Sequence, residues 1–135
     1  MHHLHINFLP VLVATVVRLV LGGVWYAPPL FGKAWSSLTG CTQQEMKARL
    51  PKALATDFFA GFVMMLVLAH VVYWAGARYA AEGAFVGFLS WLGFVAAVQL
   101  IALVYEKKSF KLFVINSGFL LLTLMIGGVI MAVWR

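Results

Sequence analysis

The chain has 135 residues, of which 64% are hydrophobic and only 10% are charged. A soluble domain carries about 25% charged residues and needs them to cover its surface, so this composition excludes an ordinary soluble fold and predicts an integral membrane protein. The formal net charge is +6. Most of the basic residues fall in links between apolar runs, as in cytoplasmic loops, so we expect the lipid bilayer and no nucleic acid as a partner.

Four apolar runs follow one another along the chain, at about residues 7–26, 53–75, 84–105 and 112–134. About 20 residues rising 1.5 Å each cross the roughly 30 Å hydrocarbon core. Backbone groups in lipid must pair within their own segment, so the runs are expected to be helices. The predicted fold class is all-α: an integral membrane four-helix bundle, with residues 1–135 forming a single transmembrane domain.

Between the first two runs, Thr42 and Glu45 have the spacing of a capping box. This spacing predicts a short amphipathic helix over about 43–50, lying on the membrane surface. We expect Pro51 to end it, because proline lacks the N–H that a helix interior requires.

The basic residues predict the orientation. The links 27–52 and 106–111 carry most of them, whereas the middle link has only Arg78 and Glu82. Cytoplasmic loops are enriched in Lys and Arg. We therefore expect a bacterial inner (plasma) membrane protein that crosses the membrane several times, with loops 27–52 and 106–111 in the cytoplasm and both termini outside.

The first apolar run ends in the sequence WYAPPLFGKAW, residues 25–35. Trp and Tyr favour the headgroup layer because it accommodates both an apolar ring and a polar N–H or O–H, and lysine can lie at the same boundary. We therefore interpret Trp25, Tyr26, Lys33 and Trp35 as an interface anchor.

This motif resembles the signature of a domain-of-unknown-function family of small four-span membrane proteins from bacteria and fungi. Further matches extend the resemblance along the chain, at Trp91-Leu92-Gly93-Phe94, Glu106, Lys111-Leu112, Ile115-Asn116, Gly118 and Gly127-Gly128. The resemblance implies a four-span topology and supplies no catalytic residues. The amino-terminal histidines depart from the family pattern.

Arg18 lies near the middle of the first run, where insertion of a cation costs at least about 2.5–3.5 kcal/mol. It shares a helix face with the small residues Ala14 and Gly22, which allow another helix to approach. The candidate partner is Asp57, although side-chain directions stretch the gap, so a bridging water or Asn116 is an alternative. Arg18 is either a contact for an anion or substrate, or a structural cation; Asp57 is alternatively an amino-terminal charge favoured by the helix dipole.

Small and polar residues recur at helical spacing on the last two runs. Such stripes favour close helix packing, with interhelical hydrogen bonds from hydroxyl and amide groups. Gln99 is expected to point away from Ser90, so either the bundle has polar contacts on two sides or a second copy covers that face. The stripe residues are Gly83, Gly87, Ser90 and Ala97 on the third run, and Asn116, Thr123 and Gly127 on the fourth.

The four histidines, His2, His3, His5 and His70, are an alternative site for a transition metal. A flexible terminus supplies no fixed geometry, so we expect no metal and no cofactor. The single cysteine, Cys41, has no second thiol. Phosphate-binding, zinc-protease and nucleophile motifs are absent from the sequence, so we expect no enzyme.

Two functions remain open. The favoured one is assembly, as a homo-oligomer or an accessory subunit of a membrane complex. The alternative is a minimal transporter or channel with a polar path around Arg18, Asp57 and Asn116. The size and four-span plan are similar to those of small multidrug exporters, but the first run has no glutamate. Arg18→Gln separates the two functions, since a transport role predicts lost flux and a structural role predicts lost protein.

Overall fold

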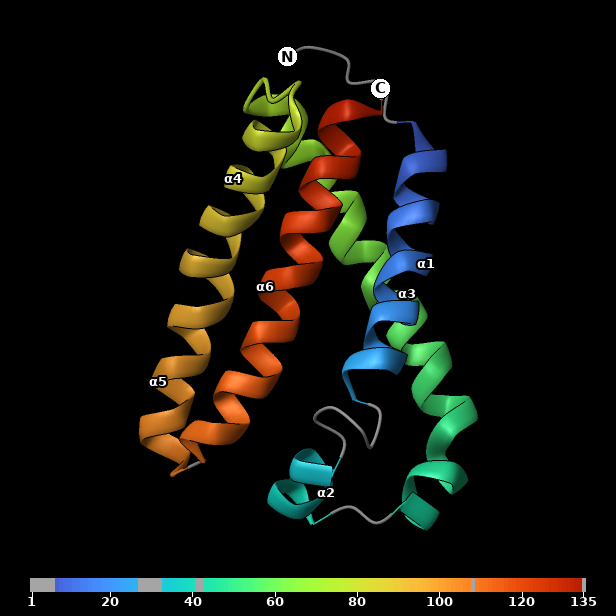
Figure 1. Cartoon of the computed structure of the whole chain (residues 1–135), viewed down its shortest axis with the longest axis vertical. Helices are drawn as coiled ribbons and strands as arrows, with labels where there is room; N and C mark the ends of the chain where they lie inside the picture. Colours follow the sequence, from blue (N-terminus) through green and yellow to red (C-terminus); the bar gives the residue numbers. More distant parts are fainter. Residues whose placement is uncertain (1–6, 27–32, 41–42, 108, 135) are drawn as a thin grey trace.

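A computed structural model describes residues 7–26, 33–40, 43–107 and 109–134, and within these ranges the regular structure is entirely helical (Figure 1). The elements are α1 (Phe8–Trp25), α2 (Lys33–Thr39), α3 (Gln43–Trp74), α4 (Ala80–Trp91), a π-helical turn (Leu92–Ala96), α5 (Ala97–Glu106) and α6 (Phe110–Val133). Four helical stretches are long and apolar enough to cross a membrane: Phe8–Trp25, Ala48–Trp74, Ala80–Glu106 and Phe110–Val133. The predicted all-α, four-span architecture is therefore confirmed.

Local chemistry sets the helix ends. Asn7 caps α1, where its side-chain oxygen accepts a hydrogen bond from the Leu9 N–H at 3.1 Å, and this bond satisfies a donor that the helix cannot. Ser109 caps α6 in the same way through the Leu112 N–H at 3.4 Å. Between these last two spans, Lys107 adopts a φ of 54° and ends α5. The resulting turn is short, so α5 and α6 are antiparallel neighbours.

The helix expected over about 43–50 is present, but Pro51 does not end it. Instead α3 runs unbroken for 32 residues through this proline. The ring removes one hydrogen bond and disfavours the preceding helical turn. Pro51 and its neighbours are exposed, so water can satisfy the carbonyl that loses its partner, and the cost stays low enough for the helix to continue. The short helix α2 was not foreseen.

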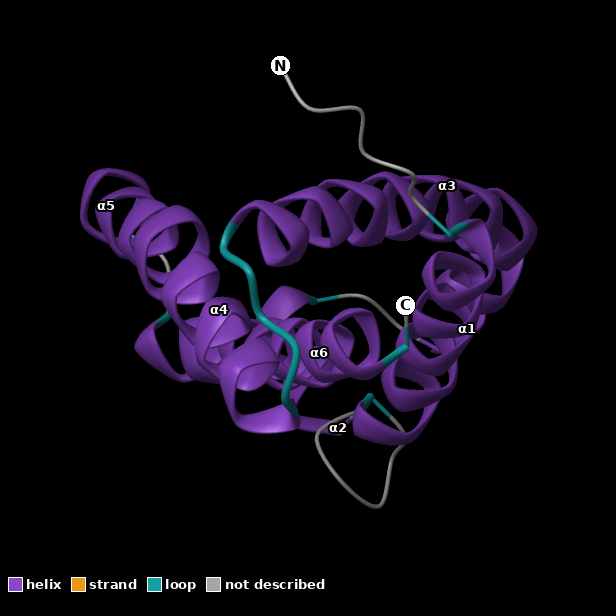
Figure 2. Ribbon diagram, turned by 90° about the horizontal axis from the view of Figure 1, so that it is seen from above, coloured by secondary structure: helices purple, strands orange, loops and turns teal. Residues whose placement is uncertain are grey.

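Helix α6 occupies the middle of the bundle (Figures 1 and 2). One side of α6 packs against α4 and α5, and the other packs against α1 and α3. The start of α1 and the end of α6 lie at the same end of the molecule, and α2 lies at the opposite end. The third span, formed by α4, the π-turn and α5, consequently has α6 as its main neighbour.

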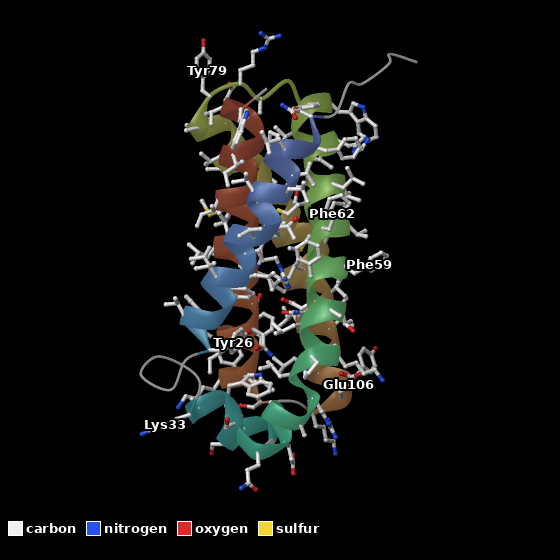
Figure 3. All side chains as sticks on the ribbon, turned by 90° about the vertical axis from the view of Figure 1, so that its right-hand side faces the viewer. Tyr26, Lys33, Phe59, Phe62, Tyr79 and Glu106 are labelled. Carbon is white, nitrogen blue, oxygen red and sulfur yellow. The ribbon has the colours of Figure 1, made fainter. Side chains whose placement is uncertain are left out.

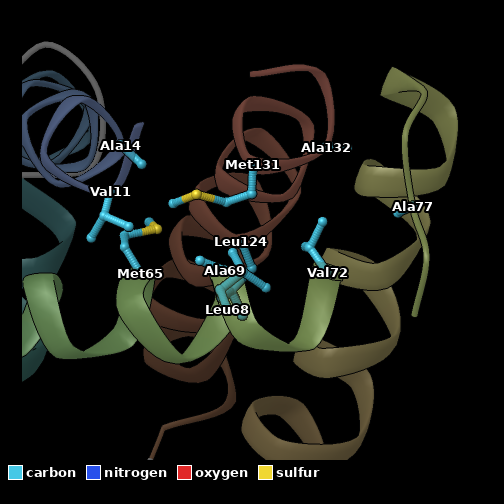
Figure 4. Packing of buried hydrophobic residues seen from close by; sticks show 10 residues of the cluster. All are labelled: Val11, Ala14, Met65, Leu68, Ala69, Val72, Ala77, Leu124, Met131 and Ala132. Carbon is cyan, nitrogen blue, oxygen red and sulfur yellow. The ribbon is translucent and has the colours of Figure 1, made fainter. Parts of the chain in front are cut away.

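The hydrophobic core gathers at the end of the bundle where α1 begins and α6 ends (Figure 4). Val11 from α1, Met65 from α3 and Met131 from α6 are at most 1% exposed. Methionine fills irregular gaps between helices because it is unbranched and polarisable. This half of the bundle is therefore closed by apolar side chains.

Glycines allow the central helix to approach two neighbours at once. A Cβ at Gly128 would collide with the carbonyl oxygen of Gly83 on α4, and one at Gly87 would collide with the carbonyl of Leu124 on α6. A Cβ at Gly127 would lie 2.8 Å from the sulfur of Met65 on α3. The predicted packing seam at Gly83 and Gly87 is confirmed, whereas Ala97 is exposed.

The π-helical turn changes which residues of the third span face the bundle. In an uninterrupted α-helix, nine residues separate Ser90 from Gln99 and place them about 180° apart. A π-turn contains an extra residue, which shifts the phase by roughly 100°. Here the Ala97 N–H donates to the carbonyl of Leu92, five residues back, and Gln99 lines a cavity together with Asn116 of α6. Gln99 was expected to point away from Ser90, with either polar contacts on two sides of the bundle or a second copy covering that face, and its place beside Asn116 favours the first alternative.

Candidate functional site

Arg18 and Asp57 form a direct ion pair between α1 and α3. The distance from Arg18 Nη1 to Asp57 Oδ1 is 2.9 Å, and the same nitrogen donates to the Asp57 carbonyl oxygen at 3.5 Å. The absence of a side chain at Gly61 makes room, because a Cβ there would lie only 3.0 Å from Arg18 Nη1. One small residue on α3 thus lets the guanidinium reach across to a carboxylate one helical turn away.

The two partners differ in their access to solvent. The Arg18 side chain is 12% exposed and that of Asp57 is 42% exposed. Asp57 borders a groove of about 640 Å³ that is also lined by Arg49, Lys52 and Thr56. The carboxylate is therefore within reach of small solutes on one side while it holds the buried cation on the other.

An aromatic face covers the remaining side of the guanidinium. Arg18 Cζ lies 5.7 Å from the centroid of the Phe119 ring on α6, a distance at which a cation is attracted to the ring. Arg18 Nε is buried without a hydrogen-bond partner among the described atoms. Arg18 thus connects its own helix, α1, to α3 through the ion pair and to α6 through the Phe119 ring.

Two anchor residues turn their polar atoms into the bundle. Tyr26 Oη donates to Asn116 Oδ1 at 2.7 Å, and Trp25 Nε1 donates to the Ile115 carbonyl at 3.1 Å. Both rings pack on Phe119, with centroid separations of 6.3 Å for Trp25 and 5.5 Å for Tyr26. These contacts therefore attach the end of α1 to α6. The sequence had predicted only an anchor in the headgroup layer.

The other anchor residues remain near this end. Trp35 of α2 meets the Tyr26 ring edge-on at 6.1 Å, and Lys33 is exposed. Figure 3 shows Tyr26, Lys33 and Glu106 toward one end of the bundle and Tyr79 at the other. The aromatic and charged side chains at this end agree with an anchor at the membrane interface.

The hydroxyl groups predicted to join the helices behave differently. Thr123 is buried but donates to the Leu120 carbonyl of its own helix at 3.0 Å, and Ser90 is half-buried on α4. The link between α4 and α6 instead comes from Trp91, whose Nε1 lies 2.7 Å from the Ser117 carbonyl oxygen and 3.2 Å from Ser117 Oγ. The sequence signal that was overlooked is a tryptophan in the interior of a span, where its N–H needs a partner.

Of the four histidines, only His70 lies within the described residues. His70 Nδ1 lies 2.8 Å from the Leu66 carbonyl on its own helix, and its ring meets Trp74 at 5.6 Å. No group of three or more metal-binding side chains occurs in the described part of the chain. His2, His3 and His5 lie outside the described residues, so the alternative of a metal site there is untested.

The four spans and the charged pair held between two of them define a multi-pass α-helical membrane protein. A family model described as a protein of unknown function (DUF1761) matches residues 9–132. The chain therefore belongs to this family, as the resemblance had indicated. Neither a curated protein nor a solved structure matches the chain.

Proposed function

We propose that the protein acts by assembly in a bacterial inner membrane, as a homo-oligomer or as an accessory subunit of a larger complex, with no catalytic activity of its own. The observation that carries this proposal is the position of the third span. Only 6% of the apolar window of Ala80–Glu106 is buried, compared with 22%, 28% and 39% for the other spans in chain order. A span held by one main neighbour has most of its surface available to a partner.

The exposed face of this span supports a helical partner. Gly93 and Ala97, four residues apart, are both exposed, and a Cβ at Gly93 would meet nothing within 4 Å. Small residues at this spacing let a second membrane helix approach closely, and large side chains beside them supply contact area. Phe94 at 81% and Ile101 at 59% exposure flank the two small residues.

The test compares two glycine variants of the full chain in detergent. Gly93→Leu places a bulky side chain on the proposed contact, and Gly23→Leu makes the same change on α1, where a Cβ also meets nothing within 4 Å. Light scattering coupled to size-exclusion chromatography should show a smaller complex for Gly93→Leu and an unchanged one for Gly23→Leu. A monomeric wild-type protein that also copurifies with no partner would refute assembly.

A transporter is the second candidate, and the polar cluster favours it. Arg18, Asp57, Tyr26 and Asn116 lie in one half of the bundle, and Asp57 borders a groove. In this conformation apolar side chains such as Met65 close the other half, so transport would need that half to open. Arg18→Gln should then abolish flux in proteoliposomes while the protein remains folded; a structural role predicts loss of detergent-stable protein instead.

The orientation is part of the proposal, with both termini outside and the loops 27–52 and 106–111 in the cytoplasm. The excess of basic residues in these loops supports it. Cys41, in the first loop, is the single cysteine and reports the topology directly. A membrane-impermeant maleimide should label Cys41 only after the inner membrane is opened, and labelling in sealed cells would reverse the orientation.

A further inference from the structure

A second cavity, of about 360 Å³, lies where α2, α5 and α6 meet. Its polar lining comes from Gln99, Lys107, Ser109 and Asn116, and its apolar lining includes Leu103 and Phe113. The cavity is separate from the groove beside Asp57, since the two share no described lining residue. The Arg18–Asp57 pair therefore does not account for the polar lining of this cavity.

The polar groups of the lining are suited to an anion. Asn116 Oδ1 already accepts from Tyr26, which leaves the amide N–H groups of Asn116 to donate. Ser109 Oγ accepts from the Leu112 N–H, so its hydroxyl proton is also left to donate. Lys107 adds a full positive charge, and the described lining contains no carboxylate.

Gln99 adds an amide that the protein alone does not satisfy. Its Oε1 is buried with no hydrogen-bond partner among the described atoms. This atom is an acceptor, so a phosphate or an ester carbonyl does not satisfy it, and only the amide N–H groups of Gln99 can donate to such a ligand.

The position of the cavity indicates a membrane lipid as the source of the anion. Lys107 lies in the turn between two spans, and Gln99 lies about 10 Å deeper, seven residues before the end of α5. Asn116 is about 9 Å deep on α6 by the same measure. The cavity therefore runs from the predicted headgroup level into the predicted hydrocarbon, with charge at its outer end and apolar side chains among deeper amides.

We propose that this cavity binds one anionic phospholipid, with the phosphate at Lys107 and the glycerol ester carbonyls at the amides of Gln99 and Asn116. Phosphate attracts the lysine ammonium, and ester carbonyls accept from amide N–H groups. A choline headgroup is disfavoured because its cation would meet Lys107. The inference goes beyond assembly, because a monomer contains the whole cavity.

The test is native mass spectrometry of the full chain in detergent, titrated with phosphatidylglycerol, with phosphatidylcholine of the same acyl chains, and with inorganic phosphate. We expect one tight phosphatidylglycerol per chain and about tenfold weaker phosphatidylcholine binding. Lys107→Asn removes the charge and keeps a residue that tolerates positive φ, and it should weaken phosphatidylglycerol binding about tenfold. Gln99→Leu should weaken it severalfold, and among the described residues it removes no hydrogen bond.

Lys111→Gln is the matched control, since it removes the same charge from an exposed position that does not line the cavity. Lys111→Gln should change the affinity by no more than about twofold, because Lys111 does not line the cavity and the variant removes no contact there. Equal binding of the two lipids, or equal weakening by Lys107→Asn and Lys111→Gln, would overturn the site. Displacement of the lipid by millimolar inorganic phosphate would instead assign the cavity to a free anion and refute the proposal that its ligand is a phospholipid.

Discussion

Gly128→Ala is the most direct test of the packing between α4 and α6. Gly128 is buried, and the added methyl would collide with the carbonyl oxygen of Gly83, well inside the 3.0 Å limit that Cβ atoms respect. The obstacle is a backbone carbonyl in the first turn of α4, so no side-chain rotation can relieve it. The two helices must separate.

Two opposing effects set the magnitude. Replacing glycine by alanine in a helix interior gains about 1 kcal/mol in propensity. Forcing a methyl into a filled interface costs typically about 1–3 kcal/mol, and we take about 2–3 kcal/mol here because the separation also loosens the contact at Gly87. We expect Gly128→Ala to lower the free energy of unfolding by about 1–2 kcal/mol after the propensity gain.

The measurement is denaturant unfolding in detergent micelles followed by circular dichroism. The matched control is Gly23→Ala on α1, where a Cβ meets nothing within 4 Å and the propensity gain alone should stabilise by up to about 1 kcal/mol. Opposite signs for the two variants would support the close approach. If Gly128→Ala proves as stable as Gly23→Ala, the described contact between α4 and α6 does not exist.

Three further outcomes follow from the site and the helix ends. Asp57→Leu should lower the free energy of unfolding by about 2 kcal/mol, because the Arg18 side chain, which is only 12% exposed, loses its carboxylate partner. Adding Arg18→Leu should recover this stability in the same unfolding assay. Tyr26→Phe should cost about 1 kcal/mol by removing the 2.7 Å bond to Asn116, and it should cost nothing extra in an Asn116→Leu background. Pro51→Ala should raise stability by about 1–3 kcal/mol, since it restores a helical hydrogen bond; a loss of stability would mean that the proline-containing turn is required.

The amino-acid sequence determined the membrane class, the four spans and the need for a partner at Arg18. These follow from composition and from the order of residues along the chain, because a bilayer forces about 20 consecutive apolar residues into a helix and penalises any charge among them. The cap of the first span at Asn7 also depends only on neighbouring residues, because its hydrogen bond joins Asn7 to Leu9. The close packing at Gly83 and Gly87 was likewise predicted from the sequence, since small residues at helical spacing have few other uses in a membrane.

Only the tertiary structure decided how the polar residues are shared between helices. The direct pair of Arg18 with Asp57 depends on the space left at Gly61, which follows Asp57 by four residues on α3. The position of Gln99 depends on a π-helical turn that shifts the helical phase, and periodicity counted at 3.6 residues cannot include such a turn. The inward hydrogen bond of Tyr26 likewise depends on the position of α6, because a polar side chain bonds to whichever neighbouring helix offers a partner at its depth.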